Sequence, residues 1–269
     1  MFRLNSTASL VFAGALIIGS AQAMTRLAVE MTCPYDGIKF TFNAQNSGTA
    51  FDRLLDGMAL GAIESPWPLA ICPTNGFVFL KENYEADELE RLRPLILSSE
   101  YQKVKDETPY YRAAWIMERS GSSHSDASRF LVQATWEAGF AELAERGRNS
   151  AASLSAQDAN KLFGRLMAEG TTGERYRRYA TELLARLQVD VADASRSLDA
   201  RVADRLLIGE LLRRLGRFTE AGSHFVSLVN DLNPASKEAM LAEFQRKLIA
   251  GSDAGLHSVS EALGGSQRR

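Results

Sequence analysis

Two short segments of the chain repeat one pattern, and this repeat is the strongest constraint on what the N-terminal part can form. Residues 33–40 and 72–79 both read Cys-Pro-x-(Asp/Asn)-Gly, followed by apolar residues at alternate positions. Asp-Gly and Asn-Gly favour tight turns because both residues tolerate positive φ angles. Alternating apolar residues are typical of strands. Residues 24–84 are therefore predicted to form a small β-cap built from two turn-and-strand units.

The segment between the two units, residues 47–69, contains the run Ser-Pro-Trp-Pro-Leu at its end. Each proline holds the residue before it in an extended conformation. The segment is therefore predicted to be an extended or irregular connection. Trp67, which stands between the two prolines, is expected to cover the junction between the cap and the helices that follow.

The first 23 residues have the pattern of a secretory signal peptide. Arg3 supplies a positive charge, residues 8–19 form an uncharged apolar run, and Ala-Gln-Ala at 21–23 matches the small-x-small sequence of a cleavage site. The run has about 12 residues, whereas a helix needs roughly 20 to span the hydrocarbon core. We predict cleavage after Ala23, no permanent membrane anchor, and a mature protein in the periplasm or outside the cell.

Cys33 and Cys72 are the only cysteines of the chain. Export takes them to an oxidising compartment, where pairs of cysteines form disulfides. A disulfide that closes a loop of about 40 residues contributes on the order of 4 kcal/mol by the chain-entropy relation. A structural disulfide is the prediction, and free thiols or a residual metal site are the alternatives.

Helical periodicity begins near residue 85 and continues to residue 250. Thr108 followed by Pro109 is a typical helix start, because threonine is a good N-cap and proline suits the first helical position. Residues 171–187 form the clearest amphipathic run. The region 85–250 is therefore predicted to be a stack of helices.

Residues 203–234 have the spacing of one tetratricopeptide-like unit of two antiparallel helices. Gly209 and Ala221 are small where the two helices approach each other, and Gly216 lies in the turn between them. One unit cannot bury its faces alone, so neighbouring helices must complete the stack. Residues 251–269 are rich in Gly and Ser and are predicted to be a flexible tail.

Three motifs carry a resemblance to a known family: the two Cys-Pro frames, Ser-Pro-Trp-Pro at 65–68, and Thr-Pro-Tyr-Tyr-Arg-Ala-Ala-Trp at 108–115. Together they resemble the uncharacterised bacterial family called domain of unknown function 2225, over roughly residues 31–145. The resemblance implies a zinc-ribbon-like N-terminal part with two Cys-Pro-x-Cys knuckles, followed by tetratricopeptide-like helices. It implies no known reaction.

The chain departs from this family at the metal ligands. Asp36 and Asn75 stand where the second cysteine of each knuckle would be. Structural zinc is usually held by four thiolates or imidazoles, so no metal is predicted. A disulfide could instead hold together the two turns that zinc bridges in relatives. The predicted fold class is mainly α: a small, degenerate zinc-ribbon-like β-cap followed by a tetratricopeptide-like helical stack.

The sequence contains no recognised catalytic motif. It has no His-x-x-x-His pair, Gly-x-Ser-x-Gly elbow, phosphate-binding glycine loop or dinucleotide fingerprint. The three histidines are expected at surface or partly packed positions. A formal net charge of -2 gives no field that gathers nucleic acid. We therefore predict no catalytic residue, no cofactor, no metal and no nucleic-acid partner.

Two arginine clusters are the candidate partner-binding sites. Such clusters can recognise an acidic peptide or a carboxylate or phosphate polymer, although a charge run on an amphipathic helix is more often a solvated face. The candidate residues are Arg175 and Arg178, with Arg177 between them, and Arg213, Arg214 and Arg217.

The predicted function is that of an exported periplasmic binding or scaffold protein. It would hold an unknown protein or peptide partner at the cell envelope in the concave face of the helical stack. The alternative is a metal-dependent enzyme or factor that acts on the cell envelope, with a polar pocket at the junction of cap and helices. The residues that could build this pocket are Asp36, Asn75, Asp52 and Asp56.

Overall fold

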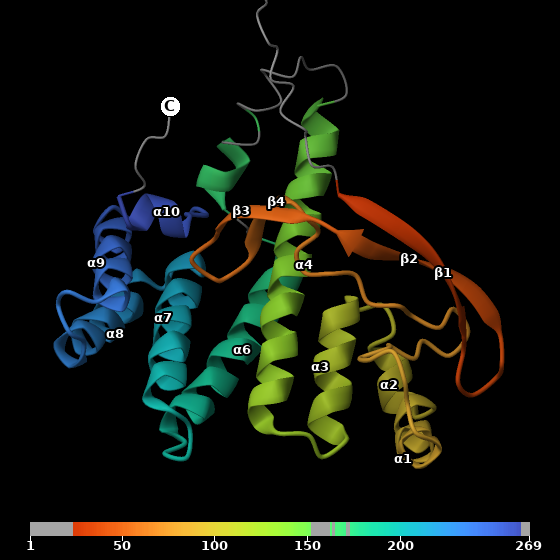
Figure 1. Ribbon diagram of the computed structural model, residues 1–269. Helices are drawn as coiled ribbons and strands as arrows, with labels where there is room; N and C mark the ends of the chain where they lie inside the picture. Colours follow the sequence, from red (N-terminus) through yellow and green to blue (C-terminus); the bar gives the residue numbers. More distant parts are fainter. Residues whose placement is uncertain (1–23, 152–161, 163–164, 171–172, 265–269) are drawn as a thin grey trace, which may run out of the picture.

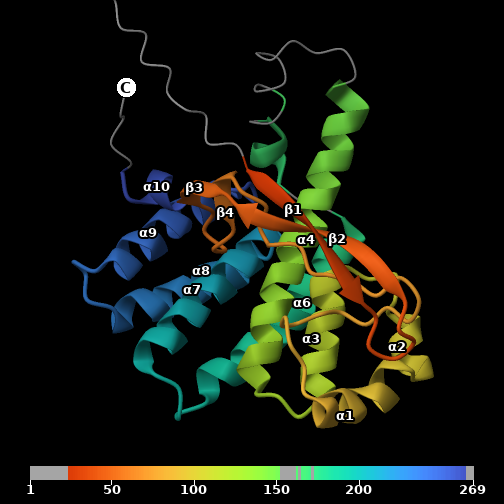
Figure 2. The same ribbon diagram turned by 45° about the vertical axis from the view of Figure 1, so that its right-hand side comes forward.

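The computed structural model describes residues 24–151, 162, 165–170 and 173–264. The predicted signal peptide lies outside these residues. The β strands lie across one end of a row of helices, as both views show (Figures 1 and 2). The predicted fold class is confirmed, since the protein is mainly helical and its helical stack follows a small β region. None of the described helices combines the length and the apolar character needed to cross a membrane.

Two antiparallel hairpins make up the β region. β1 (Thr25–Thr32) pairs with β2 (Lys39–Ser47), and β3 (Thr49–Arg53) pairs with β4 (Ala59–Ala62). The β1–β2 ribbon is mostly exposed on both faces. The prediction of an extended or irregular connection over residues 47–69 is wrong where β3 and β4 pair as a hairpin. Its strands are joined across a turn that contains Gly57, whose φ is +91°, and they lack a clear apolar alternation that would reveal them.

The helices pack in chain order, and from α3 to α9 each described helix contacts the next one. α3 begins as predicted, because the Thr108 hydroxyl accepts a hydrogen bond from the Tyr111 N–H and Pro109 is the first helical residue. The helices are α1 (Ala86–Ile96), α2 (Ser99–Lys103), α3 (Pro109–Arg119), α4 (His124–Ala151), α6 (Glu174–Ala192), α7 (Leu198–Arg214), α8 (Phe218–Asp231), α9 (Lys237–Ala250) and α10 (Val259–Ala262).

The α7–α8 pair has the close packing that its small residues predict. A Cβ atom on Gly209 would overlap the ring of Phe225, so the ring packs directly against the backbone of α7. Ala221 is fully buried in the same contact region. Gly216 turns the chain between the two helices with a φ of +73°. Glycine suits both positions, because it has no Cβ atom to block the close approach or to oppose a positive φ.

The described residues form four apolar clusters, of which two are large and two are small. The largest cluster lies among α3, α4, α6 and α7, and its centre includes Leu131, Tyr179 and Leu183. The second joins the β region to α1, α2 and α3 through Phe77 and Tyr101. The N-terminal β region is therefore packed on the helices as part of the same core.

The predicted flexible tail differs from the structure over residues 251–264. Leu256 is buried, and its N–H donates to the Met167 carbonyl at 2.8 Å. The Leu55 N–H donates to the His257 carbonyl at 3.0 Å, which ties this segment to the β3–β4 hairpin. The segment is rich in Gly and Ser, but one buried apolar side chain and several backbone hydrogen bonds hold it in place.

Candidate functional site

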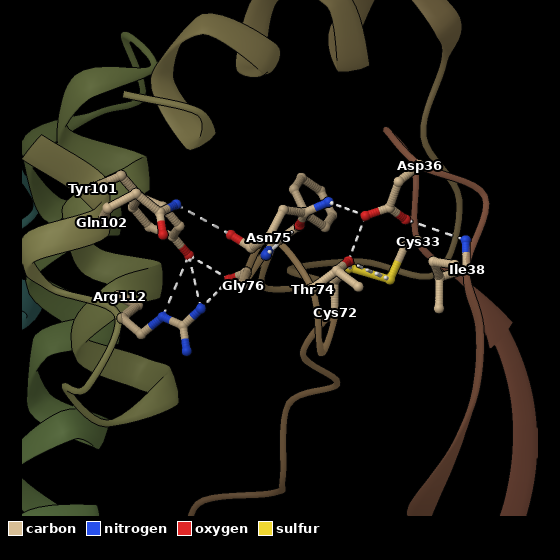
Figure 3. Close-up of a disulfide and its surroundings, with 11 residues drawn as sticks. Cys33, Asp36, Ile38, Cys72, Thr74, Asn75, Gly76, Tyr101, Gln102 and Arg112 are labelled. Atoms are coloured by element: carbon tan, nitrogen blue, oxygen red, sulfur yellow. Dashed lines mark hydrogen bonds between the residues drawn. A yellow bond between two sulfur atoms is a disulfide. The ribbon is translucent and has the colours of Figure 1, made fainter. Parts of the chain in front are cut away.

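Cys33 and Cys72 form a disulfide, as predicted (Figure 3). Their Cα atoms lie 5.4 Å apart and both side chains are 1% exposed. The bond lies in the apolar cluster that joins the β region to α1–α3. It closes a loop between positions that are 39 residues apart, for which the chain-entropy relation gives about 4 kcal/mol of stability.

Cys33 opens a tight turn, residues 33–38, which we call the first cysteine turn. The Cys33 N–H donates to the Ile38 carbonyl at 2.8 Å, and the Gly37 N–H donates to the Cys33 carbonyl at 3.1 Å. The Asp36 carboxylate accepts the Ile38 N–H at 3.1 Å. Gly37 has a φ of +70°, which explains why glycine stands there.

Residues 72–77 form the second cysteine turn, which has the same hydrogen bonds. The Cys72 N–H donates to the Phe77 carbonyl at 2.9 Å, and the Gly76 N–H donates to the Cys72 carbonyl at 3.0 Å. The Asn75 side-chain oxygen accepts the Phe77 N–H at 2.9 Å, and Gly76 has a φ of +74°. The repeated sequence pattern therefore encodes a repeated backbone structure.

The second cysteine turn is anchored to the helices by a buried arginine (Figure 3). The guanidinium of Arg112, which is 4% exposed, donates to the Gly76 carbonyl and, at 3.2 Å, to the Lys105 carbonyl. The Tyr101 hydroxyl donates to the same Gly76 carbonyl at 2.7 Å. The sequence alone predicts no role for Arg112. Its only signal was a place in the motif at 108–115, because nothing local shows that an arginine will be buried.

The polar groups beside the disulfide form a closed set of hydrogen bonds. Thr74 and Asn75 both donate to the Asp36 carboxylate, the latter at 3.3 Å. These bonds, with that of Thr74 the strongest cause, hold the pKa of Asp36 below its ordinary value. The sulfurs and an Asp36 oxygen lie within 4.8 Å of one another. However, a metal site of this kind needs thiolates, and each sulfur is bonded to the other. The arrangement thus acts as a covalent structural link.

Arg213 and Arg214 do not lie on the surface, in contrast to the predicted partner-binding role. Arg213 is 0% exposed and pairs with Glu210 at 2.7 Å, while its guanidinium also donates to the Asp253 carbonyl at 2.6 Å. Arg214 pairs with the buried Asp56 at 2.8 Å. The Arg213 guanidinium holds the 251–264 segment in place, and the Arg214 guanidinium holds the turn between β3 and β4. A surface partner has no access to them.

Arg175, Arg178 and Arg217 keep a partly exposed position. Arg178 makes two hydrogen bonds of 2.7 and 2.8 Å to Glu107, and the nearest Arg175 nitrogen lies 3.6 Å from the same carboxylate. Arg217 pairs with Glu220 on its own helix turn at 2.5 Å. Each of these arginines therefore already has an acidic partner.

One group of side chains resembles the components of a hydrolytic triad without its geometry. His124 Nδ1 lies 2.9 Å from an Asp190 oxygen, and the Ser128 hydroxyl donates to the other oxygen at 2.7 Å. In a nucleophilic triad the histidine accepts the serine proton. Here the serine donates to the aspartate and to the His124 carbonyl, so the cluster joins α4 to the end of α6.

The residues of the alternative polar pocket lie in three separate places. Asp36 and Asn75 belong to the cysteine turns, whereas Asp56 is buried against Arg214. Asp52 accepts a hydrogen bond of 2.5 Å from the Ser260 hydroxyl at the end of the chain. These four side chains thus build no common pocket.

A groove of about 690 Å³ lies between the β3–β4 hairpin and α4. Two large apolar side chains in its lining are exposed, Phe51 by 81% and Phe140 by 52%. Within its sheet β4 pairs only with β3 among the described strands, so its other edge has no strand partner. The groove could not be predicted from the sequence, because the β3–β4 hairpin that forms one of its walls has no clear sequence pattern. The lining residues are Phe51, Met58, Ala59, Leu60, Gly61, Ile63, Glu64, Ser65, Pro66, Glu137, Phe140 and Ala141.

Glu137 is an acid of the groove whose pKa departs from its ordinary value. Its carboxylate accepts the Tyr110 N–H at 2.9 Å and a hydrogen bond from the Thr108 side chain, at the start of α3. Burial raises the pKa of Glu137 to about 7, and the two hydrogen bonds lower it only in part. This carboxyl group therefore changes its charge near neutral pH.

Fold and site together define a mainly helical protein in which one disulfide links two turns of the β region. An apolar groove of this protein contains an acidic group. No family model matches the chain, and no curated protein or solved structure matches it. The resemblance to domain of unknown function 2225 stays a prediction.

Proposed function

We propose that the protein is an exported binding protein that holds an extended, apolar segment of a partner protein in the groove between β4 and α4. The observation that supports this most directly is the pair of exposed aromatic side chains, Phe51 and Phe140, in the lining of a single groove. Contiguous exposed apolar surface of this kind marks interaction sites in soluble domains. The class of function is the one predicted from the sequence, but the proposed binding face is this groove and not the arginine clusters.

The edge of β4 that has no strand partner among the described residues favours an extended peptide as the occupant. The Ala59 N–H at this edge already donates to the Ser65 hydroxyl at 3.0 Å, so an added strand pairs with the remaining backbone groups. An unpaired strand edge offers backbone N–H and C=O groups, and an added strand satisfies them while its alternate side chains enter adjacent pockets. β4 has 4 residues, which corresponds to about 13 Å at roughly 3.3 Å per residue. A peptide segment of about four residues therefore pairs along β4, with every second side chain directed into the groove.

Two features support an exported location. The first 23 residues have the signal-peptide pattern, and the structure contains a buried disulfide. Reducing systems keep most cytosolic thiols free, whereas disulfides persist in the periplasm and outside the cell. The binding site would then face partners at the cell envelope.

The test uses the mature chain, residues 24–269, and a fluorescein-labelled ten-residue peptide in which valine alternates with glutamine. Fluorescence anisotropy should show binding to the wild type, and Phe51→Asp or Phe140→Asp should weaken it by about tenfold or more, as expected for an aromatic anchor. Val226→Asp is the matched control, because Val226 is 51% exposed on α8, outside the groove. It should leave the affinity unchanged.

Two outcomes would overturn the proposal. One is that the peptide does not bind, or binds equally well to all four proteins. The other is that sedimentation shows a dimer of the wild type that Phe51→Asp dissociates. In that case the groove is occupied by a second copy of the chain rather than by a partner segment.

A further inference from the structure

Glu137 is unusual among the groove residues because it is acidic and partly buried, and it has no basic partner among the described residues. No lysine, arginine or histidine in the described part of the chain forms an ion pair with it. Its hydrogen bonds come from the Tyr110 N–H and the Thr108 side chain. Partial burial of a carboxylate without a countercharge is unfavourable, and the position of Glu137 in the lining of a groove leaves room for a partner charge.

Helix capping alone does not account for a carboxylate at this place. Thr108 already caps α3 through the Tyr111 N–H, and an uncharged side chain at position 137 could accept the Tyr110 N–H equally well. A carboxylate gains only from the positive end of the helix, an effect of a few tenths to about 1 kcal/mol. Its desolvation outweighs this gain, since burial is the largest influence on the group.

The charges around Glu137 leave the groove acidic. From the segment after β4, Glu64 lines the groove and is neutralised by Arg26 of β1. From α3, Tyr110 contributes a phenol whose hydroxyl donates to the Trp67 carbonyl at 2.8 Å. None of the lining residues is basic. Glu137 is therefore the one lining carboxylate that has no basic partner among the described residues.

We propose that the groove selects partner segments that place a basic side chain against Glu137. This inference rests on the proposed function and names its ligand class: an extended, apolar segment with one lysine or arginine at a groove-facing position. A basic group there forms a charge-assisted hydrogen bond with the carboxylate. It replaces the water that burial has removed. The apolar walls provide affinity, and Glu137 provides specificity.

The pH dependence follows from the ionisation of Glu137. Above pH 7 the carboxylate predominates and attracts the cation, while below pH 7 the neutral acid does not. A lysine side chain stays charged over this range, because its ordinary pKa is about 10.4. Binding of a basic segment should therefore strengthen as pH rises from 5.5 to 8 and release a proton from the protein near pH 7.

Three versions of the alternating peptide separate charge recognition from groove binding. One central valine is replaced by lysine, glutamine or glutamate, and anisotropy is measured with the mature protein at pH 5.5 and 8. At pH 8 the lysine peptide should bind about tenfold more tightly than the glutamine peptide, since a charge-assisted bond is worth about that factor. At pH 5.5 the two affinities should become nearly equal. The glutamate peptide should bind most weakly at pH 8.

Glu137→Gln should remove the lysine preference and its pH dependence while the glutamine peptide still binds. Glu64→Gln is the matched control in the same groove, because Glu64 is already paired with Arg26, and it should keep both. Equal binding of the lysine and glutamine peptides to the wild type at pH 8 would overturn the inference but leave the proposed function standing. If none of the three peptides binds, both fail. The wild-type comparison holds even if the Glu137→Gln variant does not fold, which circular dichroism reveals.

Discussion

The two cysteine turns share their sequence pattern and their backbone hydrogen bonds, but they differ in what surrounds them. The first continues into β2 of the exposed ribbon, and a Cβ atom on Gly37 would meet nothing within 4 Å. The second packs against α2 and α3, where a Cβ atom on Gly76 would overlap the Arg112 guanidinium. The repeat therefore specifies local geometry, while tertiary contacts decide how much each copy contributes to stability.

The disulfide is the one covalent link between these unequal turns, so its removal should have the largest effect. Cys33→Ser combined with Cys72→Ser should lower the free energy of unfolding by about 4 kcal/mol, the chain-entropy value for a loop of this size. Urea unfolding of the mature protein measures the change. Hydrogen exchange should show the greater loss of protection in β1 and β2, because the second turn keeps its anchor to Arg112.

Intact wild-type protein provides the control for this experiment. Alkylation of protein purified without reductant, followed by mass spectrometry, should modify neither cysteine until a reductant is added. Two alkylated thiols without reductant would contradict the disulfide. Equal loss of protection in both turns would contradict the inequality between them.

Alanine at the two turn glycines gives a direct comparison of the same change in two environments. Both glycines have positive φ angles, so each substitution costs about 1 kcal/mol for the backbone. At Gly76 the new methyl group also displaces Arg112 from its carbonyl acceptor, which raises the expected cost to about 3 kcal/mol. Urea unfolding should therefore show a larger loss for Gly76→Ala than for Gly37→Ala.

Equal losses would mean that Arg112 moves aside without cost. Arg112→Met tests this point independently, because it removes the guanidinium and keeps most of the side-chain volume. If Arg112 anchors the turn, Gly76→Ala should cost less in the Arg112→Met background than in the wild type, since the two changes share one contact.

The same contrast explains which parts of the structure were predictable from sequence. The cysteine turns and the start of α3 depend on residues close together in the chain, such as Asp36 with Gly37 and Thr108 with Pro109. Turn and capping chemistry acts over these short spacings. The α7–α8 pair was also predictable, because small residues at fixed intervals permit close helix packing.

The parts that were missed depend on partners far away in the chain. Arg214 has a helical surface pattern in sequence, but its acid, Asp56, lies 158 residues earlier. The backbone of Leu55 meets that of His257 at the other end of the chain. The groove exists only because the β3–β4 hairpin lies on α4. No local pattern contains these contacts, so the burial of Arg213 and Arg214 could not be predicted from the sequence.

The smallest predicted effect concerns Asp36, whose counterpart in the second turn is the uncharged Asn75. Hydrogen bonds from Thr74 and the Ile38 N–H hold its folded pKa below the ordinary value. The ionised form thus stabilises the fold above the ordinary pKa, and this contribution is lost as pH falls through the lower folded value. Asp36→Asn should therefore flatten the decline of unfolding free energy between about pH 5 and pH 2. Urea unfolding at a series of pH values measures this slope.

The reciprocal change should act in the opposite direction. Asn75→Asp keeps the turn acceptor for the Phe77 N–H but places a second carboxylate beside Asp36, where Asn75 now donates a hydrogen bond of 3.3 Å. Two like charges at this distance repel, and protonation of one relieves the repulsion. The variant should lose stability at pH 7 and recover part of it near pH 4. Identical pH profiles for both variants and the wild type would show that the asymmetry between acid and amide has no energetic role, and that the turns differ only through Arg112.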